Sequence, residues 1–160
     1  MNDLENLYID ALQLSTHGET DKAQKVIDKI LKINPNYGKA HYLLGLMSLE
    51  YDDLEMAKEH ANIAIKDDPC NPLGYYLYCD ILIAEQNLNA IKTITEGLVN
   101  LKIIDKGFIY HKLACAYEIN RQYVNAIETL YKSKEHGSSI SWGSFVEDEI
   151  LRIRRKLQAA

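Results

Sequence analysis

Proline and cysteine are both scarce in this chain, with three of each among 160 residues. Cys70, Cys79 and Cys115 are odd in number and form no C-x-x-C pair, which argues against a disulfide framework and a zinc module. No uninterrupted apolar run approaches the roughly 20 residues that a membrane-spanning helix needs. The first residues lack the basic start and apolar core of a secretory signal. We therefore predict a cytoplasmic protein with no membrane insertion.

The charge balance is acidic, with a formal net charge of -5 and a pI near 5.5. Electrostatic binding of nucleic acid needs clustered lysine and arginine, so we expect no nucleic-acid partner. The sequence has no P-loop and no G-x-G-x-x-G, G-x-S-x-G or H-E-x-x-H motif. We therefore predict no catalysis, no cofactor and no bound metal. The length and the 47% hydrophobic content fit one globular domain over residues 1–160.

The main signal in the sequence is self-similarity at a period close to 34 residues. Small residues recur in two series, which are Ala11, Gly45, Cys79 and Ala114, and Ala23, Ala57, Ala90 and Ala126. Other residues that follow this period are Tyr8, Tyr42 and Tyr76, and the pair Pro35 and Pro69. Small side chains such as Gly45 and Ala57 let two antiparallel helices cross closely. The period predicts four equivalent helical hairpins, which bury their apolar faces by stacking.

These residues resemble the tetratricopeptide repeat, whose pattern runs from an aromatic residue through Leu-Gly, Tyr, Ala and a second aromatic residue to Pro. The second unit reads His41, Leu44, Gly45, Ser48, Ala57, Ala61 and Pro69, so its small residues and its proline match that pattern while its aromatic positions do not. The fourth unit keeps Tyr110, Leu113, Ala114, Tyr117 and Ala126. Ser138 stands near the place where its terminal proline would fall. The resemblance covers about residues 4 to 136.

The resemblance implies an all-α fold in which antiparallel helix pairs stack into a right-handed superhelix. The implied repeats are about 4–37, 38–71, 72–105 and 106–138, within one domain. A last helix near 142–158 carries Val146, Ile150, Ile153 and Leu157 on one face, and we expect it to cap the stack. The alternative is that this helix binds a partner.

Local chemistry predicts where the helices begin and end. Asn34-Pro35 and Asp68-Pro69 end helices, because a residue before proline avoids the helical region. Thr20 and either Asp52 or Asp53 are candidate N-caps. The predicted helices span residues 3–16, 20–33, 38–51, 54–67, 72–86, 88–101, 106–120, 123–135 and 142–158.

In this family the first helix of each hairpin lines the concave side, so the resemblance places a binding groove there. The groove residues that we predict are Tyr8, Leu12, Tyr42, Leu46, Tyr76, Asp80 and His111. Asp80 is the single charge in its apolar helix, and it either anchors a basic ligand residue or reaches solvent or a tyrosine hydroxyl. The tyrosines and leucines have an alternative role as ordinary core residues.

We therefore expect a protein–protein interaction module, which means an adaptor, scaffold or chaperone-like protein that binds a peptide or helix in an apolar groove. Some members of this family grip a carboxylate with basic residues, but the corresponding places here hold Tyr8, Leu12, Leu43, Leu73 and Leu77, so that ligand is not predicted. One alternative is a homo-oligomer that assembles through the apolar first helices. Another is a regulatory repeat module of a larger enzyme.

His111 and Cys115 are four residues apart on one predicted helix and therefore share a face. This local Cys-His pair could suggest nucleophilic catalysis or, together with Asp80, a metal site. The sequence offers no recognisable orienting acid or oxyanion-hole loop, and a helical cysteine is commonly a small packing residue. We therefore assign His111 to the groove and not to catalysis.

Overall fold

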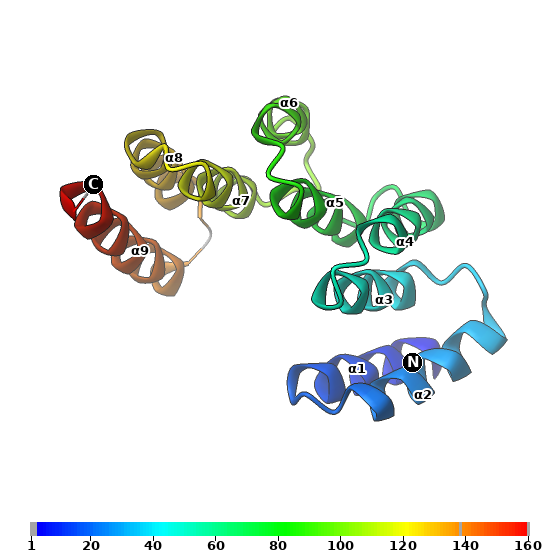
Figure 1. Cartoon of the computed structure of the whole chain (residues 1–160). Coiled ribbons are helices and arrows are strands. Elements are labelled where there is room, and N and C mark those ends of the chain that lie inside the picture. The colour runs from blue at the N-terminus through cyan, green and yellow to red at the C-terminus, as the bar shows by residue number, and fades with distance from the viewer. Residues whose placement is uncertain (1–2, 138, 160) are drawn as a thin grey trace. The chain divides into compact units, whose positions relative to one another are not determined.

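The computed structural model describes residues 3–137 and 139–159, and every regular element in this part of the chain is an α-helix. Figure 1 labels the helices in chain order. Their bounds are α1 Asp3–Thr16, α2 Thr20–Ile33, α3 Gly38–Glu50, α4 Leu54–Asp67, α5 Leu73–Ala84, α6 Leu88–Leu98, α7 Lys106–Ile119, α8 Tyr123–His136 and α9 Ile140–Ala159. The predicted all-α class is confirmed.

The helix ends follow local chemistry. Asn34 and Asp68, which each precede a proline, have extended backbone and end α2 and α4 as predicted. The largest error lies at the end of α6, which stops at Leu98 and not at 101. There the side-chain amide of Asn100 donates to the carbonyl of Glu96 at 2.9 Å, which satisfies an unpaired group of the last turn.

The predicted N-caps were correct in one case and wrong in another. Asp53 caps α4, because its carboxylate accepts the backbone N–H of Met56 at 3.1 Å. Thr20 is not an N-cap, because α2 already begins there and the capping position is Glu19. The side chain of Glu19 makes no capping hydrogen bond. Ser138, which ends the fourth predicted repeat, lies outside the described residues.

Contacts gather the chain into two compact units, Met1–Tyr78 and Cys79–Ala160, and the boundary falls inside α5. In the first unit α1 packs against α2, and α3 packs against α4. In the second unit α7 packs against α6 and α8, and α8 packs against α9. From α1 to α4 and from α6 to α9, helices that follow one another in the sequence are therefore neighbours.

Each unit contains an apolar core. The core of the first unit includes Tyr8, Ala11, Ile27, Ile30, Ala40, Leu43 and Met47. The core of the second unit includes Ala114, Ala126, Leu130, Val146, Ile150 and Ile153. The last three residues confirm the buried face predicted for α9. Leu157, which was predicted on the same face, is 41% exposed near the end of that helix.

The turns inside the hairpins share one backbone conformation. Gly18, Asp52, Gln86 and Arg121 all have left-handed backbone, with φ of 74°, 59°, 54° and 57°. They lie 34, 34 and 35 residues apart in the sequence. In each turn the N–H of this residue bonds to the carbonyl three residues earlier, and the next N–H bonds to the carbonyl five residues before it. These two bonds define the Schellman ending of a helix, which thus occurs four times in this part of the chain.

Two glycines permit close packing. A Cβ added to Gly45 would overlap Leu77 of α5, which is fully buried. The nearest neighbour of Gly45 is therefore the first helix of the next hairpin. A Cβ at Gly107 would lie 2.7 Å from the Cα of Gly137 and 3.0 Å from the carbonyl oxygen of Ser133. Since real Cβ atoms essentially never approach that closely, α7 and α8 depend on glycine at this crossing.

Candidate functional site

Tyr8, the first of the predicted groove residues, lies in the core of the first unit. Only 8% of its surface is exposed, and the ammonium of Lys39 stands 5.3 Å from its ring centroid. Lys39 is held in turn by the carboxylate of Glu5 at 2.7 Å. Burial raises the pKa of the Tyr8 hydroxyl. Tyr8 is therefore a core residue, which was the alternative role for these tyrosines, and it has little exposed surface for a ligand.

The other predicted residues of this unit are partly exposed. They are Leu12 on α1, Tyr42 and Leu46 on α3, and Tyr76 on α5. Leu12 and Tyr42 also pack against the core that contains Tyr8. Each of these three first helices thus keeps apolar side-chain surface that a partner could bury.

Asp80 and His111 belong to the second unit, and the structure does not leave Asp80 as a free charge. Its carboxylate forms an ion pair with Lys112 of α7. The ammonium of Lys112 also lies 4.9 Å from the ring centroid of Phe108. The side chains of Asp80 and Lys112 are 26% and 18% exposed, respectively. A basic ligand residue would therefore have to compete with Lys112 for Asp80.

His111 lies in a cluster of aromatic rings, which we call the aromatic patch and which consists of Phe108, His111, Trp142 and Phe145. The ring centroid of His111 is 5.5 Å from that of Trp142 and 5.3 Å from that of Phe145. The indole N–H of Trp142 donates to the carbonyl of Ser133 at 3.2 Å, which orients the ring. Phe145 remains 46% exposed. The last helix therefore adds aromatic surface beside His111, as well as covering the core.

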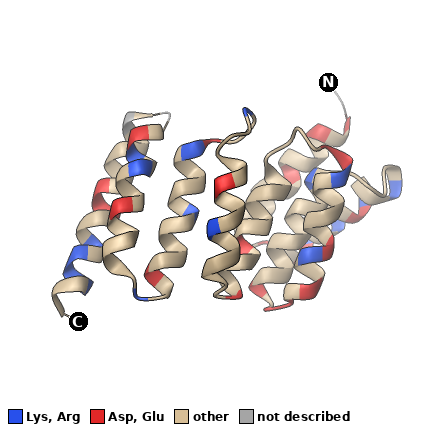
Figure 2. Cartoon of the chain, turned by 90° about the horizontal axis from the view of Figure 1, so that it is seen from above, with Lys and Arg blue, Asp and Glu red and all other residues tan. Residues whose placement is uncertain are grey.

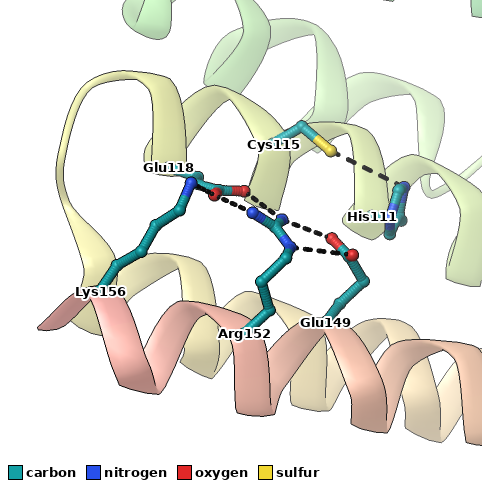
Figure 3. Close-up of polar contacts among 6 residues, drawn as sticks. All are labelled: His111, Cys115, Glu118, Glu149, Arg152 and Lys156. Atoms are coloured by element: carbon teal, nitrogen blue, oxygen red, sulfur yellow. Dashed lines mark hydrogen bonds and ion pairs between the residues drawn. The ribbon is translucent and has the colours of Figure 1, made fainter.

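A charge network fastens α9 to α7 (Figure 3). Arg152 donates to both carboxylate oxygens of Glu118, at 2.5 and 2.7 Å, and Lys156 donates to Glu118 at 2.7 Å. Arg152 also donates to Glu149, one turn earlier in α9. Only 13% of the Glu118 side chain is exposed. Glu118 is thus a largely buried carboxylate whose donors come from the last helix.

The electrostatics of this network keep Glu118 ionised. Burial, the largest single influence, raises the pKa of its carboxyl, but the hydrogen bonds from Arg152 and Lys156 together outweigh burial and lower it. Glu118 and Glu149 raise the pKa of the Arg152 guanidinium in return. Glu118 and Arg152 therefore both remain charged near neutral pH.

His111 and Cys115 share a face of α7, and Nδ1 of the imidazole lies 3.9 Å from Sγ (Figure 3). Burial raises the pKa of the Cys115 thiol to about 11 and lowers the pKa of the His111 imidazole. Both groups are therefore neutral near pH 7. A cysteine nucleophile is activated by a lowered thiol pKa and a cationic partner, whereas here the thiol pKa is raised and the imidazole is neutral. The pair is suited to packing against the aromatic patch and poorly suited to nucleophilic catalysis.

The alternative of a metal site at Asp80, His111 and Cys115 finds no support. Among the residues that the structure describes, no group of three or more His, Cys, Asp or Glu side chains is arranged to hold a metal ion. Asp80 is engaged by Lys112 instead.

Acidic and basic side chains are interspersed along the helices (Figure 2). None of the helices in the described ranges is long and apolar enough to cross a membrane.

Sequence reasoning missed the contribution of α9 to this site. Trp142, Phe145 and Arg152 come from the segment that was predicted to cap the stack or bind a partner. One signal was present, because Phe145 stands one position from Val146 and therefore off the predicted buried face, where burial does not require an aromatic residue. Their position over α7 follows only from the packing of α8 against α9.

Comparison with models of known protein families finds none that matches this chain, and comparison with curated proteins finds no match either. The function therefore has to be argued from the geometry of the chain itself.

Proposed function

We propose that this chain is a right-handed stack of tetratricopeptide-like helical hairpins that binds a peptide or helix of another protein. The observation that carries the proposal is the recurrence of one left-handed turn at Gly18, Asp52, Gln86 and Arg121. Equal hairpins at a period of 34 to 35 residues are the structural signature of this repeat class. Such repeats work by presenting matching positions of successive units on one surface. The proposed location is the cytoplasm, where the free thiols of Cys70, Cys79 and Cys115 would stay reduced.

The partner-binding residues in this proposal are the partly exposed side chains of the first helices. In the first unit these are Leu12, Tyr42, Leu46 and Tyr76. Full burial of one such side chain is worth about 1.5 to 3 kcal/mol, so four that are already partly buried contribute at most roughly 6 to 12 kcal/mol before the costs of association. A micromolar complex needs about 8 kcal/mol, so affinities in that range are within reach. In the second unit the exposed edge of Phe145 beside His111 is the corresponding contact.

The chemistry of the second unit supports binding over catalysis. Cys115 and His111 are neutral, and Asp80 is paired with Lys112. The Cys115 thiol is not activated, and in the described part of the chain Nε2 of His111 has no hydrogen-bond partner that would orient the imidazole as a general base. We therefore propose an adaptor, scaffold or chaperone-like role and no enzymatic reaction.

The test is selection of peptides from a displayed random library on the full chain, followed by affinity measurement with a labelled selected peptide. The double variant Leu46→Glu, Tyr76→Glu should weaken binding at least about tenfold, because two buried apolar contacts would each be lost. Ile33→Glu is the matched control, because Ile33 is 63% exposed on a second helix and should change affinity less than about twofold. Circular dichroism should show unchanged helicity in each variant.

Two results would count against this function. The first is that no peptide is selected, or that the double variant binds as tightly as the parent chain. The second is a light-scattering mass that rises with concentration and returns to that of one chain in the double variant. That result would assign the same apolar side chains to a homo-oligomer, the self-assembly alternative.

A further inference from the structure

Two histidines meet inside one hairpin of the first unit. His41 lies on α3 and His60 on α4, and their Nδ1 atoms are 3.0 Å apart. The ring centroids are 5.1 Å apart and the ring planes are inclined by 40°. Nε2 of His41 lies 2.9 Å from the carbonyl oxygen of Pro35. The pair is independent of the side chains proposed to bind a partner.

The carbonyl of Pro35 determines which nitrogen of His41 carries its proton. A carbonyl oxygen only accepts hydrogen bonds, so Nε2 of His41 is the donor and its Nδ1 presents a lone pair. In the metal-free pair, the Nδ1–H of His60 donates to that lone pair. Proteins commonly orient a metal-binding histidine in this way, with its remote N–H bonded to a carbonyl.

Access and charge also favour a cation at this position. His41 is 7% exposed, whereas His60 is partly exposed and opens the pair to solvent. Burial, followed by the neighbouring His41, lowers the pKa of His60. The carboxylates of Glu59 and Asp53 act on His60 in the opposite direction and are the nearby negative charges. Burial therefore favours the neutral form of His60, which is the form that binds metal, and the two carboxylates favour a cation nearby.

We propose that His41 and His60 chelate a divalent transition-metal ion such as Ni²⁺ or Zn²⁺ through their two Nδ1 atoms. Two imidazole nitrogens bonded to one ion at about 2.0 to 2.1 Å lie roughly 2.9 to 3.4 Å apart in tetrahedral or octahedral geometry. The observed separation of 3.0 Å falls in that range, so the two nitrogens can keep their spacing while the His60 ring turns to aim its lone pair at the ion. On binding, His60 moves its proton from Nδ1 to Nε2, so the ion replaces a hydrogen bond and no proton is released.

The strength and selectivity of the site follow from its two ligands. The described residues assemble no third protein ligand, so water completes the coordination and the ion binds more weakly than at a site with three or four protein ligands. Imidazole nitrogen suits Ni²⁺ and Zn²⁺, whereas Mg²⁺ and Ca²⁺ require oxygen ligands. The site therefore discriminates against the two abundant alkaline-earth ions.

The first experiment is thermal unfolding of the full chain, without an added histidine tag, in the presence of Ni²⁺, Zn²⁺ or Mg²⁺. At about 1 mM, Ni²⁺ should raise Tm by about 3 to 10 °C, because an ion that binds only the folded chain stabilises it by mass action. Mg²⁺ should have no effect. His60→Gln should abolish the Ni²⁺ response, while its amide can still bond to His41 and preserve the fold. Cys115→Ser is the control, because it removes the thiol that lies beside His111, and it should respond like the parent chain.

The second experiment locates the ion directly. Paramagnetic Ni²⁺ at less than one equivalent should broaden the NMR signals of the His41 and His60 rings before those of His17, His111 and His136. The proposal is overturned if Tm does not respond to Ni²⁺, if His60→Gln responds like the parent chain, or if other histidines broaden first.

Discussion

The left-handed turns of the hairpins provide a test with opposite substitutions. Introducing glycine at such a turn should stabilise the chain, and replacing glycine there should destabilise it. Gln86 and Arg121 adopt left-handed backbone with φ of 54° and 57°, and their side chains are exposed. Left-handed backbone costs a residue other than glycine about 1 to 2 kcal/mol. Glycine removes that cost but adds about 0.4 to 1 kcal/mol of chain entropy in the unfolded state. Gln86→Gly and Arg121→Gly should therefore each raise the free energy of unfolding by about 0.5 to 1 kcal/mol.

The reverse change at the equivalent turn should destabilise the chain. Gly18 has φ of 74°, and an added Cβ would meet no atom within 4 Å, so Gly18→Ala tests backbone conformation alone. It should cost about 1 kcal/mol. Gly97 is the matched control, because it lies inside α6 with the same open space around its Cβ. Gly97→Ala should stabilise the chain by about 0.5 kcal/mol, since alanine favours helix over glycine.

The assay is urea and thermal unfolding followed by far-UV circular dichroism. For a chain of this size, a change of 1 kcal/mol shifts Tm by about 2 to 4 °C, which is readily measured. The reasoning is refuted if Gly18→Ala is neutral or stabilising, or if both glycine variants lower Tm. The four turns would then not be equivalent, and the structural basis of the proposed repeat would be lost.

Acid should weaken the link between α7 and α9, because the pKa of Glu118 is lower in the folded chain than the ordinary 4.5 of a glutamate. Its stabilising effect is present above about pH 4.5 and is lost as the pH falls through the folded-state pKa. Glu118→Gln should therefore lose less unfolding free energy than the parent chain between about pH 5 and pH 3. An equal loss in the two chains would contradict this. The thiols should differ in reactivity, because Cys70 is exposed while burial raises the pKa of Cys79 to about 12 and that of Cys115 to about 11. A thiol reagent at pH 8 should rapidly modify only Cys70 in the folded chain and all three cysteines in denaturant. Rapid modification of Cys115 in the folded chain would show that it is more exposed than the structure indicates.

Helix positions were predictable because their causes are local. Proline after Asn34 and Asp68, and the carboxylate of Asp53 at the start of α4, act within a few residues of the backbone that they stop or cap. The period of small residues predicted the hairpins for the same reason. The recurring left-handed residue was not predicted, since only Gly18 among the four has the residue type that usually marks it.

The candidate site was predicted only in part. The sequence indicated correctly that first helices carry apolar and aromatic residues, but equal spacing does not decide exposure. Tyr8 and Tyr76 are equivalent in the period, yet Tyr8 is buried in a core and Tyr76 is partly exposed. The ion pair between Asp80 and Lys112 was missed because it joins residues on different helices.

The amino-acid sequence by itself determined the helices of this protein, their order and the places where they end, because those features depend on hydrogen bonds and turns between residues close along the chain. Only the tertiary structure decided which side chains stay open. Lys39 covers Tyr8, Lys112 neutralises Asp80, and α9 brings Phe145 to His111. The exposure and charge of a side chain depend on atoms supplied by other helices, and the residues next to it in the sequence do not indicate which atoms those are.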